Sequence, residues 1–322
     1  KHLSYLLLLL LSASGIAQSF NSSQLDSLFQ ILEENDKYMG SIAISKNGTT
    51  IYQNAIGFAD VENKIPATTK TKYRIGSITK MFTATLVLTA VEDNKLQLDQ
   101  TLDDFFPQIE NAAEITIENM LNHSSGIYNL TGRKDYFSWN TQAQTEEQLL
   151  KYIMSGDSAF EPGEKHAYSN SNYVLLTYIL EKLYTTSYAD LLKMQIAEPL
   201  NLDDTYYGGA IDISDNESYS YETLGKWVKE SETDPSVPEG AGAIVSTATD
   251  LNVFITNLFE GNIISQGSVK KMMNIKDGYG LGLFLYPYNG TFTYGHTGGV
   301  DGFKSFAFYL PEQKLAVSLL SN

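Results

Sequence analysis

Residues 73–82 read "YRIGSITKMF" and place Ser77 and Lys80 three positions apart within an apolar run. Gly76 comes directly before this pair, and apolar side chains then recur at helical spacing at Ile78, Met81, Leu88 and Val91. The pattern predicts a helix from Ser77 to about residue 94. Because residues i and i+3 share one face of a helix, the side chains of Ser77 and Lys80 can meet.

A serine and a lysine at this spacing have a possible chemical use. A serine hydroxyl is a weak nucleophile unless a neighbouring group removes its proton, and a lysine can do so when burial or nearby positive charge lowers its pKa. The N-terminus of the helix would also stabilise negative charge on a reacting oxygen. Taken alone, the pair is better explained as a small residue at a helix start followed by a solvated lysine, because this spacing occurs by chance in most long chains.

Composition limits the classes of protein to consider. The chain has 322 residues, of which 43% are hydrophobic and 19% charged, as expected for one or two globular domains. Its net charge of −16 would repel a nucleic-acid backbone, so we expect no nucleic-acid partner. Cysteine is absent, histidine occurs four times, and no His-Glu-x-x-His, Gly-x-Ser-x-Gly or dinucleotide-binding pattern is present. We therefore expect neither a metal nor another cofactor.

The first residues have the three regions of a secretory signal peptide. Lys1 and His2 precede the leucine-rich run at residues 6–11, and the small-residue stretch "SASGIAQ" follows it. We expect residues 1–18 to be a signal peptide cleaved near Ala17. The protein would then be secreted or periplasmic, with no membrane span after cleavage.

In the rest of the chain, the spacing of the apolar residues changes twice, from strand-like to helical and back to strand-like. Strands are predicted on both sides of Asn47-Gly48, a strong hairpin signal. Helical patterns follow at residues 145–154, 171–184, 188–200 and 247–261, and residues 231–240 form a loop. Aromatic and β-branched strands, separated by Asn289-Gly290 and by Pro311-Glu312, close the chain. Strands thus open the chain, helices fill its middle and strands end it.

This order predicts an α/β (α+β) fold in which both ends of the chain build one antiparallel sheet. Residues 19–95 and 240–322 would form the sheet domain with its flanking helices, and residues 96–239 an inserted, mostly helical domain.

Two further triplets accompany the serine and the lysine. Tyr168-Ser169-Asn170 precedes a predicted helix, and His296-Thr297-Gly298 lies beside a predicted strand. In this order the three motifs resemble the serine hydrolases that include class C β-lactamases, penicillin-binding DD-peptidases, D-aminopeptidases and related esterases. The resemblance covers about residues 20 to 322 and extends to segments such as "LQLDQTLDDFFP", "MLNHSSGIYN", "EPLNLDDT" and "AGAIVSTATDLNVF".

The resemblance implies a role for each catalytic position. Ser77 would be the nucleophile that forms an acyl-enzyme, and Lys80 would polarise it. Tyr168 would relay a proton to the leaving group and then activate water, provided that the neighbouring ammonium lowers its pKa from about 10.

It also implies the residues that bind substrate. Asn170 would hold the lysine or the substrate amide, and the backbone N–H groups of Ser77 and Gly299 would form the oxyanion hole. The predicted strand that leads to Gly299 would also contribute His296, Thr297 and Gly298 to substrate binding. Of the other histidines, we expect His123 to organise a loop and His166 to be exposed.

The sequence departs from the family pattern at the third triplet. The β-lactamase branch has a lysine where this chain has His296, and a histidine is mostly neutral at pH 7. Attraction for a substrate carboxylate would therefore be weaker and pH-dependent, which favours peptidase or esterase activity over efficient β-lactamase activity. Lys304 either replaces the missing charge or is a solvated strand lysine. The family also ends with a helix after its last strand, so we expect such a helix beyond residue 322.

These observations predict an exported serine hydrolase that resembles D-Ala-D-Ala carboxypeptidases, D-peptidases or β-lactamase-related hydrolases. The alternatives are an esterase on small acyl esters and a penicillin-binding sensor that does not turn over. The expected partner is a small-molecule or peptide substrate, with a peptidoglycan stem peptide or a β-lactam as candidates.

Overall fold

The computed structural model describes residues 21–223, 225–288 and 290–322. The predicted signal peptide, at residues 1–18, lies outside this described part. Within the described part, no helix has the length and apolar character needed to cross a bilayer. The predicted domain boundaries, after residues 95 and 239, stay a prediction.

Helix α1 (Ser23–Glu34) precedes the first strand, so the expectation that strands open the chain is wrong. Phe29 of this helix is buried against the sheet, and Leu25 and Leu32 pack beside it. A helix of this length is marginal in isolation, and its stability comes from packing its apolar side against another element. The sequence of the helix alone therefore gave too weak a signal.

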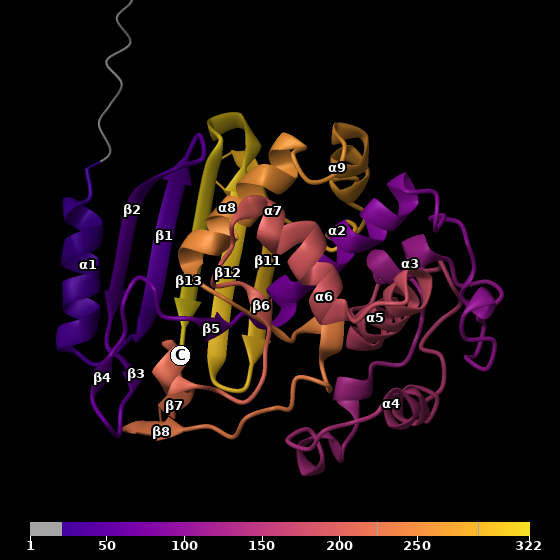
Figure 1. Cartoon of the computed structure of the whole chain (residues 1–322), viewed down its shortest axis with the longest axis horizontal. Helices are drawn as coiled ribbons and strands as arrows, with labels where there is room; N and C mark the ends of the chain where they lie inside the picture. The colour runs from indigo at the N-terminus through magenta and orange to yellow at the C-terminus, as the bar shows by residue number, and fades with distance from the viewer. Residues whose placement is uncertain (1–20, 224, 289) are drawn as a thin grey trace, which may run out of the picture.

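Among the described residues, six strands form one antiparallel sheet in the order β10-β11-β12-β13-β1-β2. Strand β13 pairs with β1, with Ala43 opposite Ser318, so strands from both ends of the chain lie side by side (Figure 1). This arrangement confirms the predicted fold class. The bounds of the strands are β1 Gly40–Lys46, β2 Thr49–Ile56, β10 Phe284–Tyr288, β11 Thr291–Val300, β12 Phe303–Leu310 and β13 Leu315–Ser321.

The turn between β1 and β2 is the predicted Asn47-Gly48 hairpin. Asn47 has a φ of 51° and Gly48 a φ of 75°. Positive φ at both central residues is what a two-residue turn matching the twist of the strands requires, and asparagine and glycine are the residues that adopt it most easily.

Helices lie on both faces of the sheet. Helix α1 covers one face, and helix α8 (Ala248–Glu260) lies across the other (Figure 1). Asn252 of α8 donates to the Ser45 hydroxyl at 3.2 Å and accepts from the Ser318 hydroxyl at 2.8 Å. Helix and sheet are thus joined by buried hydrogen bonds as well as by apolar contact.

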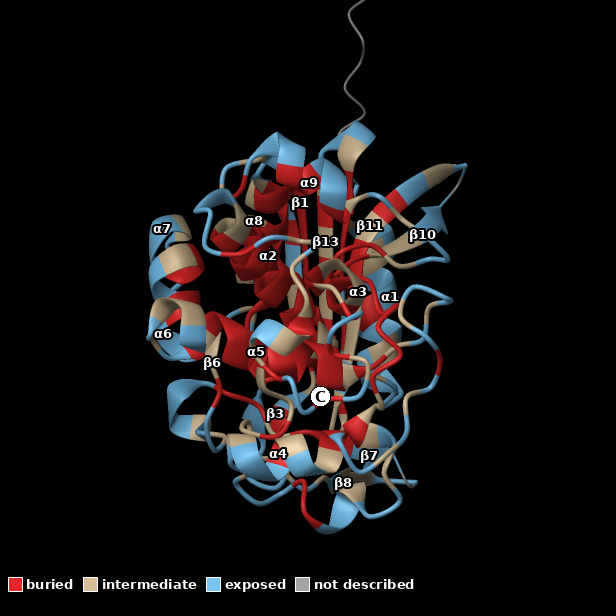
Figure 2. Ribbon diagram, turned by 90° about the vertical axis from the view of Figure 1, so that its right-hand side faces the viewer, coloured by how far each residue is buried: buried red, intermediate tan, exposed pale blue. Residues whose placement is uncertain are grey.

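Helix α2 (Thr79–Glu92) lies in the centre of the molecule, beside α5 (Asn170–Tyr184) (Figure 2). It is buried on nearly every side, as a helix without a polar face must be. Two of its threonines satisfy their hydroxyls within the helix, Thr85, which donates to the carbonyl of Met81 at 2.8 Å, and Thr89, which donates to that of Thr85 at 3.0 Å. Thr83 also donates to the carbonyl of Gly240 at 2.6 Å, outside the helix. This buried helix directly follows the predicted nucleophile.

The other helices and short strands complete the fold around α2 and α5. Two predicted boundary signals are confirmed, the capping box at Thr145 and Gln148 and the Gly261 end of α8. The remaining helices are α3 Ile117–Leu121, α4 Glu146–Ile153, α6 Tyr188–Leu192, α7 Glu198–Leu200 and α9 Gln266–Met272. The short strands are β3 Phe58–Asp60, β4 Ile65–Pro66, β5 Tyr73–Arg74, β6 Tyr206–Tyr207, β7 Tyr221–Thr223, β8 Trp227–Lys229 and β9 Ile244–Ser246.

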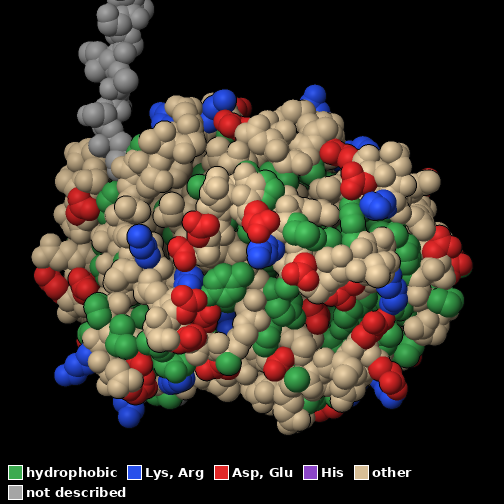
Figure 3. Space-filling view, in the orientation of Figure 1, with side chains coloured by type: hydrophobic (Ala, Val, Ile, Leu, Met, Phe, Trp, Pro, Cys, Tyr) green, Lys and Arg blue, Asp and Glu red, His purple; other side chains and the backbone are tan. Residues whose placement is uncertain are grey.

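The surface agrees with the acidic composition. On the face seen in Figure 3, Asp and Glu side chains are spread over the whole surface, with Lys and Arg between them. This face therefore offers no continuous basic patch of the kind that a nucleic-acid backbone needs.

Candidate active site

Ser77 lies on a single 3₁₀ turn (Gly76–Ile78) that connects β5 to α2. Gly76 has a φ of 50°, and a Cβ atom there would come within 2.7 Å of the backbone nitrogen of Gly299. Glycine is therefore needed at this position, both for the backbone conformation and for the close approach of strand β11. The predicted placement of Ser77 at the start of a helix is confirmed.

Lys80 lies one turn further along, with its amine nitrogen 3.2 Å from the hydroxyl oxygen of Ser77. The same nitrogen donates to Asn170 Oδ1 at 2.8 Å and to the carbonyl oxygen of Ala241 at 2.7 Å. The side chain is fully buried, and burial lowers the pKa of Lys80 well below its usual value. When the amine is neutral it has two N–H bonds, and donation to Asn170 and Ala241 then leaves its lone pair for the hydroxyl of Ser77.

Tyr168 lies beside Lys80, whose nitrogen is 4.8 Å from the centre of the tyrosine ring. Burial raises the pKa of Tyr168 above its usual value, and the nearby Ser77 hydroxyl offsets only part of that rise. Its hydroxyl makes no hydrogen bond of normal geometry with any described residue. The expectation that a neighbouring ammonium lowers the pKa of Tyr168 is wrong, because burial dominates and also favours the neutral form of Lys80.

Asn170 is the first residue of α5 and links the catalytic lysine to the neighbouring loop. Its side chain accepts from Lys80 and donates to the Thr131 hydroxyl at 2.9 Å. Its backbone nitrogen donates to Asn129 Oδ1 at 3.0 Å. These contacts fix the amide, so its oxygen points at Lys80.

His296 lies on β11 and is buried. Burial lowers the pKa of His296 to about 3, and its Nδ1 contacts the carbonyl oxygen of Thr297. The histidine is thus neutral throughout the physiological pH range. The expectation that it attracts a carboxylate in a pH-dependent way near neutrality is wrong, because a buried imidazole does not titrate there.

Strand β11 lies tightly against the turn that carries Ser77. A Cβ atom at Gly298 would collide with the carbonyl oxygen of Ile75, which itself accepts from the Ser305 hydroxyl at 2.7 Å. Gly299 is the next residue along the strand. The assignment of its N–H group and that of Ser77 to an oxyanion hole stays a prediction.

The structure brings all the predicted site residues together. They are Ser77, Lys80, Tyr168, Asn170, His296, Thr297, Gly298 and Gly299. All of them except the fully buried Lys80 line a cleft that extends to both sides of Ser77. The aromatic arm of this cleft, with a volume of about 400 Å³, is lined by Tyr168, Tyr279, Phe284 and His296. The polar arm, with a volume of about 480 Å³, is lined by Asn140, Asn170, Glu230, Thr233, Asp301 and Lys304 among others.

Two histidines near Tyr168 support the site. His123 has a φ of 61°, accepts from the Ser169 N–H at 3.2 Å and lies with its ring centre 4.4 Å from that of Tyr168. Its predicted role in organising a loop agrees with these contacts. The side chain of His166 is only 9% exposed and contacts Asp277 at 2.9 Å, so the expectation that it is exposed is wrong.

Sequence reasoning missed Tyr279 and Phe284, which complete the aromatic arm. Tyr279 stacks on His166 with ring centres 6.0 Å apart, and such packing leaves no local sequence signal. Among the described residues, no three or more His, Asp or Glu side chains gather in a way that could hold a metal ion.

Comparison with known proteins agrees with the family that the three motifs resemble. The model of the β-lactamase family matches residues 28–322. Penicillin-binding protein 4* of Bacillus subtilis is 26% identical over 92% of this chain and 71% of its own length. Teichoic acid D-alanine hydrolase of Staphylococcus aureus is 25% identical over 79% of this chain, which spans 64% of that relative.

Two solved structures are similar over nearly the whole chain. D-amino acid amidase from Ochrobactrum anthropi superposes with a TM-score of 0.82 and is 28% identical, covering 93% of this chain and 91% of its own. The octameric penicillin-binding protein homologue from Pyrococcus abyssi has a TM-score of 0.83 and 29% identity, covering 94% of this chain and 74% of its own. With the geometry around Ser77, these findings show that the chain belongs to the β-lactamase family of serine hydrolases.

Proposed function

We propose that this protein hydrolyses amide bonds in substrates built from D-amino acids, through an ester formed on Ser77. The observation that carries the proposal is the contact between Ser77 and a buried lysine, 3.2 Å apart, beside the buried hydroxyl of Tyr168. The relatives named as a D-amino acid amidase and a teichoic acid D-alanine hydrolase support the D-amino-acid class. D-Ala-D-Ala peptides, the substrates of the DD-carboxypeptidases that the sequence resembles, belong to this class.

The first step is acylation. The hydroxyl oxygen of Ser77 attacks the substrate carbonyl carbon while its proton passes to the neutral amine of Lys80. Negative charge develops on the carbonyl oxygen, where the N–H groups of Ser77 and Gly299 would stabilise it. The helix that begins after Ser77 adds a favourable dipole at the same place.

Collapse of the tetrahedral intermediate needs a proton for the leaving amine. Tyr168 holds its proton because burial raises the pKa of its phenol, so it is suited to be this general acid. The C–N bond breaks, the amine leaves with the proton of Tyr168, and the acyl group stays on Ser77. The proton held by Lys80 then returns to the tyrosinate beside it.

Deacylation repeats these transfers with water. A water molecule loses its proton to the neutral amine of Lys80, either directly or by way of the Tyr168 hydroxyl, which passes its own proton on to Lys80 as it accepts one, while the water oxygen attacks the ester carbonyl carbon. The C–O bond to Ser77 breaks, the serine oxygen regains a proton, and the product acid leaves. No group outside the chain is needed for proton balance.

Hydrolysis of three substrates in parallel tests this proposal: a D-Ala-D-Ala peptide, nitrocefin and p-nitrophenyl acetate, with Ser77→Ala as control. Peptide cleavage that the Ser77→Ala variant loses is the expected result. Cleavage of the ester alone would favour an esterase. An acyl adduct on Ser77 that mass spectrometry detects but that is never released would instead indicate a sensor.

We also propose that the protein is exported and acts in the periplasm or outside the cell. The signal-peptide pattern at residues 1–18 and the similarity to a penicillin-binding protein support this location. Sequencing the N-terminus of the protein recovered from its host tests it, with cleavage near Ala17 expected. An intact leader on the recovered protein would contradict it.

A further inference from the structure

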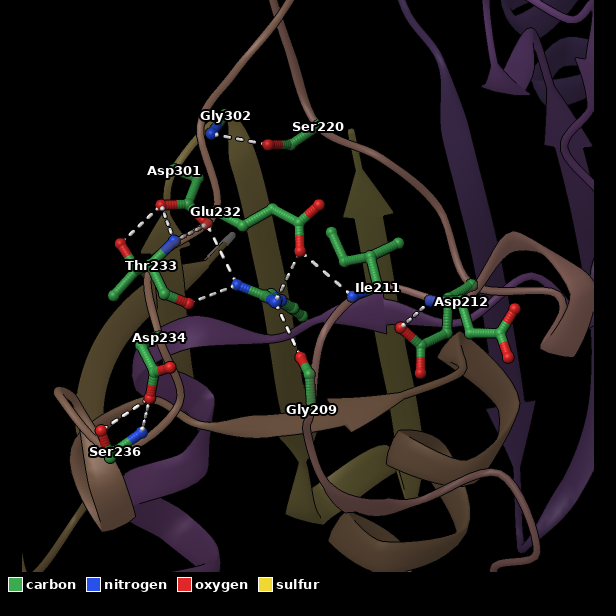
Figure 4. Close-up of polar contacts among 12 residues, drawn as sticks. Gly209, Ile211, Asp212, Ser220, Glu232, Thr233, Asp234, Ser236, Asp301 and Gly302 are labelled. Carbon is green, nitrogen blue, oxygen red and sulfur yellow. Dashed lines mark hydrogen bonds and ion pairs between the residues drawn. The ribbon is translucent and has the colours of Figure 1, made fainter. Parts of the chain in front are cut away.

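A buried arginine joins three segments around the polar arm. Arg74 ends strand β5, three positions before Ser77, and its guanidinium donates to the carbonyl oxygens of Thr233 at 2.7 Å and Gly209 at 2.9 Å. It also lies 3.4 Å from the carboxylates of Asp301 and Glu232. Figure 4 shows these partners converging from segments that are far apart in the sequence.

Asp301 connects the hydrogen-bond network of Arg74 to strand β11. It directly follows Val300, the last residue of β11, and its side chain is only 4% exposed. Its carboxylate accepts from the Thr233 N–H at 3.1 Å and from the Thr233 hydroxyl at 2.6 Å (Figure 4). Asn140 donates to the same hydroxyl at 2.8 Å, so Thr233 is held from both sides.

The contacts of Arg74 form part of the wall of the cleft. Thr233, Asp301 and Ser77 all line the polar arm. The carboxylate of Asp301 is compensated by the guanidinium, and a buried charge that loses such a partner is strongly destabilising. Without Arg74, the segment around Thr233 would therefore lose its fixed position against β11.

The position of Tyr168 indicates which half of the substrate meets this wall, an argument that rests on the proposed function. Tyr168 gives its proton to the leaving group and lines the aromatic arm. The leaving group must therefore lie in the aromatic arm, and the acyl group must extend from Ser77 into the polar arm.

We propose that Arg74 is a positioning residue that fixes the wall of the acyl-binding arm, and so determines how well substrates with large acyl groups bind. Arg74 acts through Thr233 and Asp301. A small acyl group touches little of this wall, whereas the binding of a large acyl group depends on the shape of the wall. A displaced wall thus raises KM for large acyl groups more than it changes the chemical step.

Two esters with the same leaving group test the proposal: p-nitrophenyl acetate and p-nitrophenyl phenylacetate. In Arg74→Met, the ratio of kcat/KM for phenylacetate to that for acetate should fall about ten-fold, mainly through KM. Arg74→Lys keeps the charge but not the fork of donors, so it should restore part of the ratio. An unchanged ratio in Arg74→Met would overturn the proposal.

Two control variants separate positioning from stability. Lys72 is also a buried cation, two residues earlier, but its ion pairs go to Asp215 and Asp204 away from the cleft. Lys72→Met should lower the melting temperature and leave the ratio unchanged. The double variant Arg74→Met/Asp301→Asn removes the more buried of the two carboxylates that lose their partner, so its melting temperature should recover in part while the ratio stays low. If the ratio recovered together with the melting temperature, Arg74 would act only by balancing the charge of Asp301, and the proposal would be wrong.

Hydrogen exchange gives a readout that needs no turnover. The Thr233 amide, bonded to Asp301, should exchange faster in Arg74→Met than in the wild type, whereas amides of α2 should not change. Because this measurement uses no substrate, it separates failure of this inference from failure of the proposed hydrolase activity. Equal exchange at Thr233 in both proteins would contradict the inference.

Discussion

The amine nitrogen of Lys80 lies 3.2 Å from the hydroxyl oxygen of Ser77 and donates to the backbone carbonyl of Ala241 at 2.7 Å. Its environment favours the neutral amine, because the side chain is fully buried and burial lowers its pKa well below the usual value. The protonation state of this one group links catalysis to the stability of the fold.

The lowered pKa of Lys80 predicts a pH-dependent stability difference between the wild type and Lys80→Met. Between the lowered pKa and about 10.4, the unfolded chain binds a proton that the folded protein does not. The stability of the wild type should therefore rise relative to Lys80→Met as pH increases, by up to about 1.4 kcal/mol per pH unit. Thermal unfolding of both proteins at pH 7 and pH 9 measures this. A difference that is the same at both pH values would show that Lys80 is charged in the fold.

Tyr168→Phe should separate two kinds of leaving group. An amine needs a proton to leave, so hydrolysis of a D-amino-acid p-nitroanilide should slow by about 10²-fold or more. The p-nitrophenolate of an ester leaves without a proton, so its release should slow far less. Stopped-flow measurement of acylation with both substrates checks this, and equal losses on both would argue that Tyr168 is not the proton donor.

The same variant should not lose stability. The Tyr168 hydroxyl is buried without a hydrogen bond of normal geometry to any described residue, and such a group costs free energy. Removing it should therefore leave the free energy of unfolding unchanged or raise it by up to about 1 kcal/mol. Denaturant unfolding measures this, and a large loss of stability would reveal a contact that the hydroxyl makes.

His296→Asn should reduce the sensitivity of the protein to acid. The folded pKa of His296 is about 3, against about 6.5 in the unfolded chain, so only the unfolded chain binds this proton between those values. The wild type therefore loses stability as pH falls from about 6.5 towards 3. At pH 5 this loss is about 2 kcal/mol, and the variant should not show it. Unfolding curves at pH 7.5 and pH 5 test the prediction, and parallel losses in both proteins would refute it.

Gly298→Ala and Gly299→Ala should differ although the residues are adjacent. A Cβ atom at Gly298 collides with the Ile75 carbonyl, whereas at Gly299 the nearest atoms, on Lys304 and Phe303, are 3.8 Å away. Gly298→Ala should lower the free energy of unfolding by about 1–3 kcal/mol. Gly299→Ala should stay within about 0.5 kcal/mol of the wild type. Comparable stability of the two variants would mean that β11 is not held against the Ser77 turn.

Several elements could be predicted because their signals are local. Asn47-Gly48 predicted a hairpin because few other residues accept positive φ at both positions, and Thr145 with Gln148 predicted the start of a helix. Short strands such as β5 and β9 escaped prediction because two or three residues are too few to show a period. They exist because neighbouring segments supply their hydrogen bonds.

The sequence by itself determined that Ser77 and Lys80 share one face of a helix, because a spacing of three residues is a property of the helix and of nothing beyond it. Only the tertiary structure decided in which direction the pKa values of Lys80, Tyr168 and His296 are shifted, because burial depends on every segment packed around a group. It also decided the role of Arg74, which in the sequence is an ordinary charge before a helix. Its partners come from distant segments, and only folding brings them to its guanidinium.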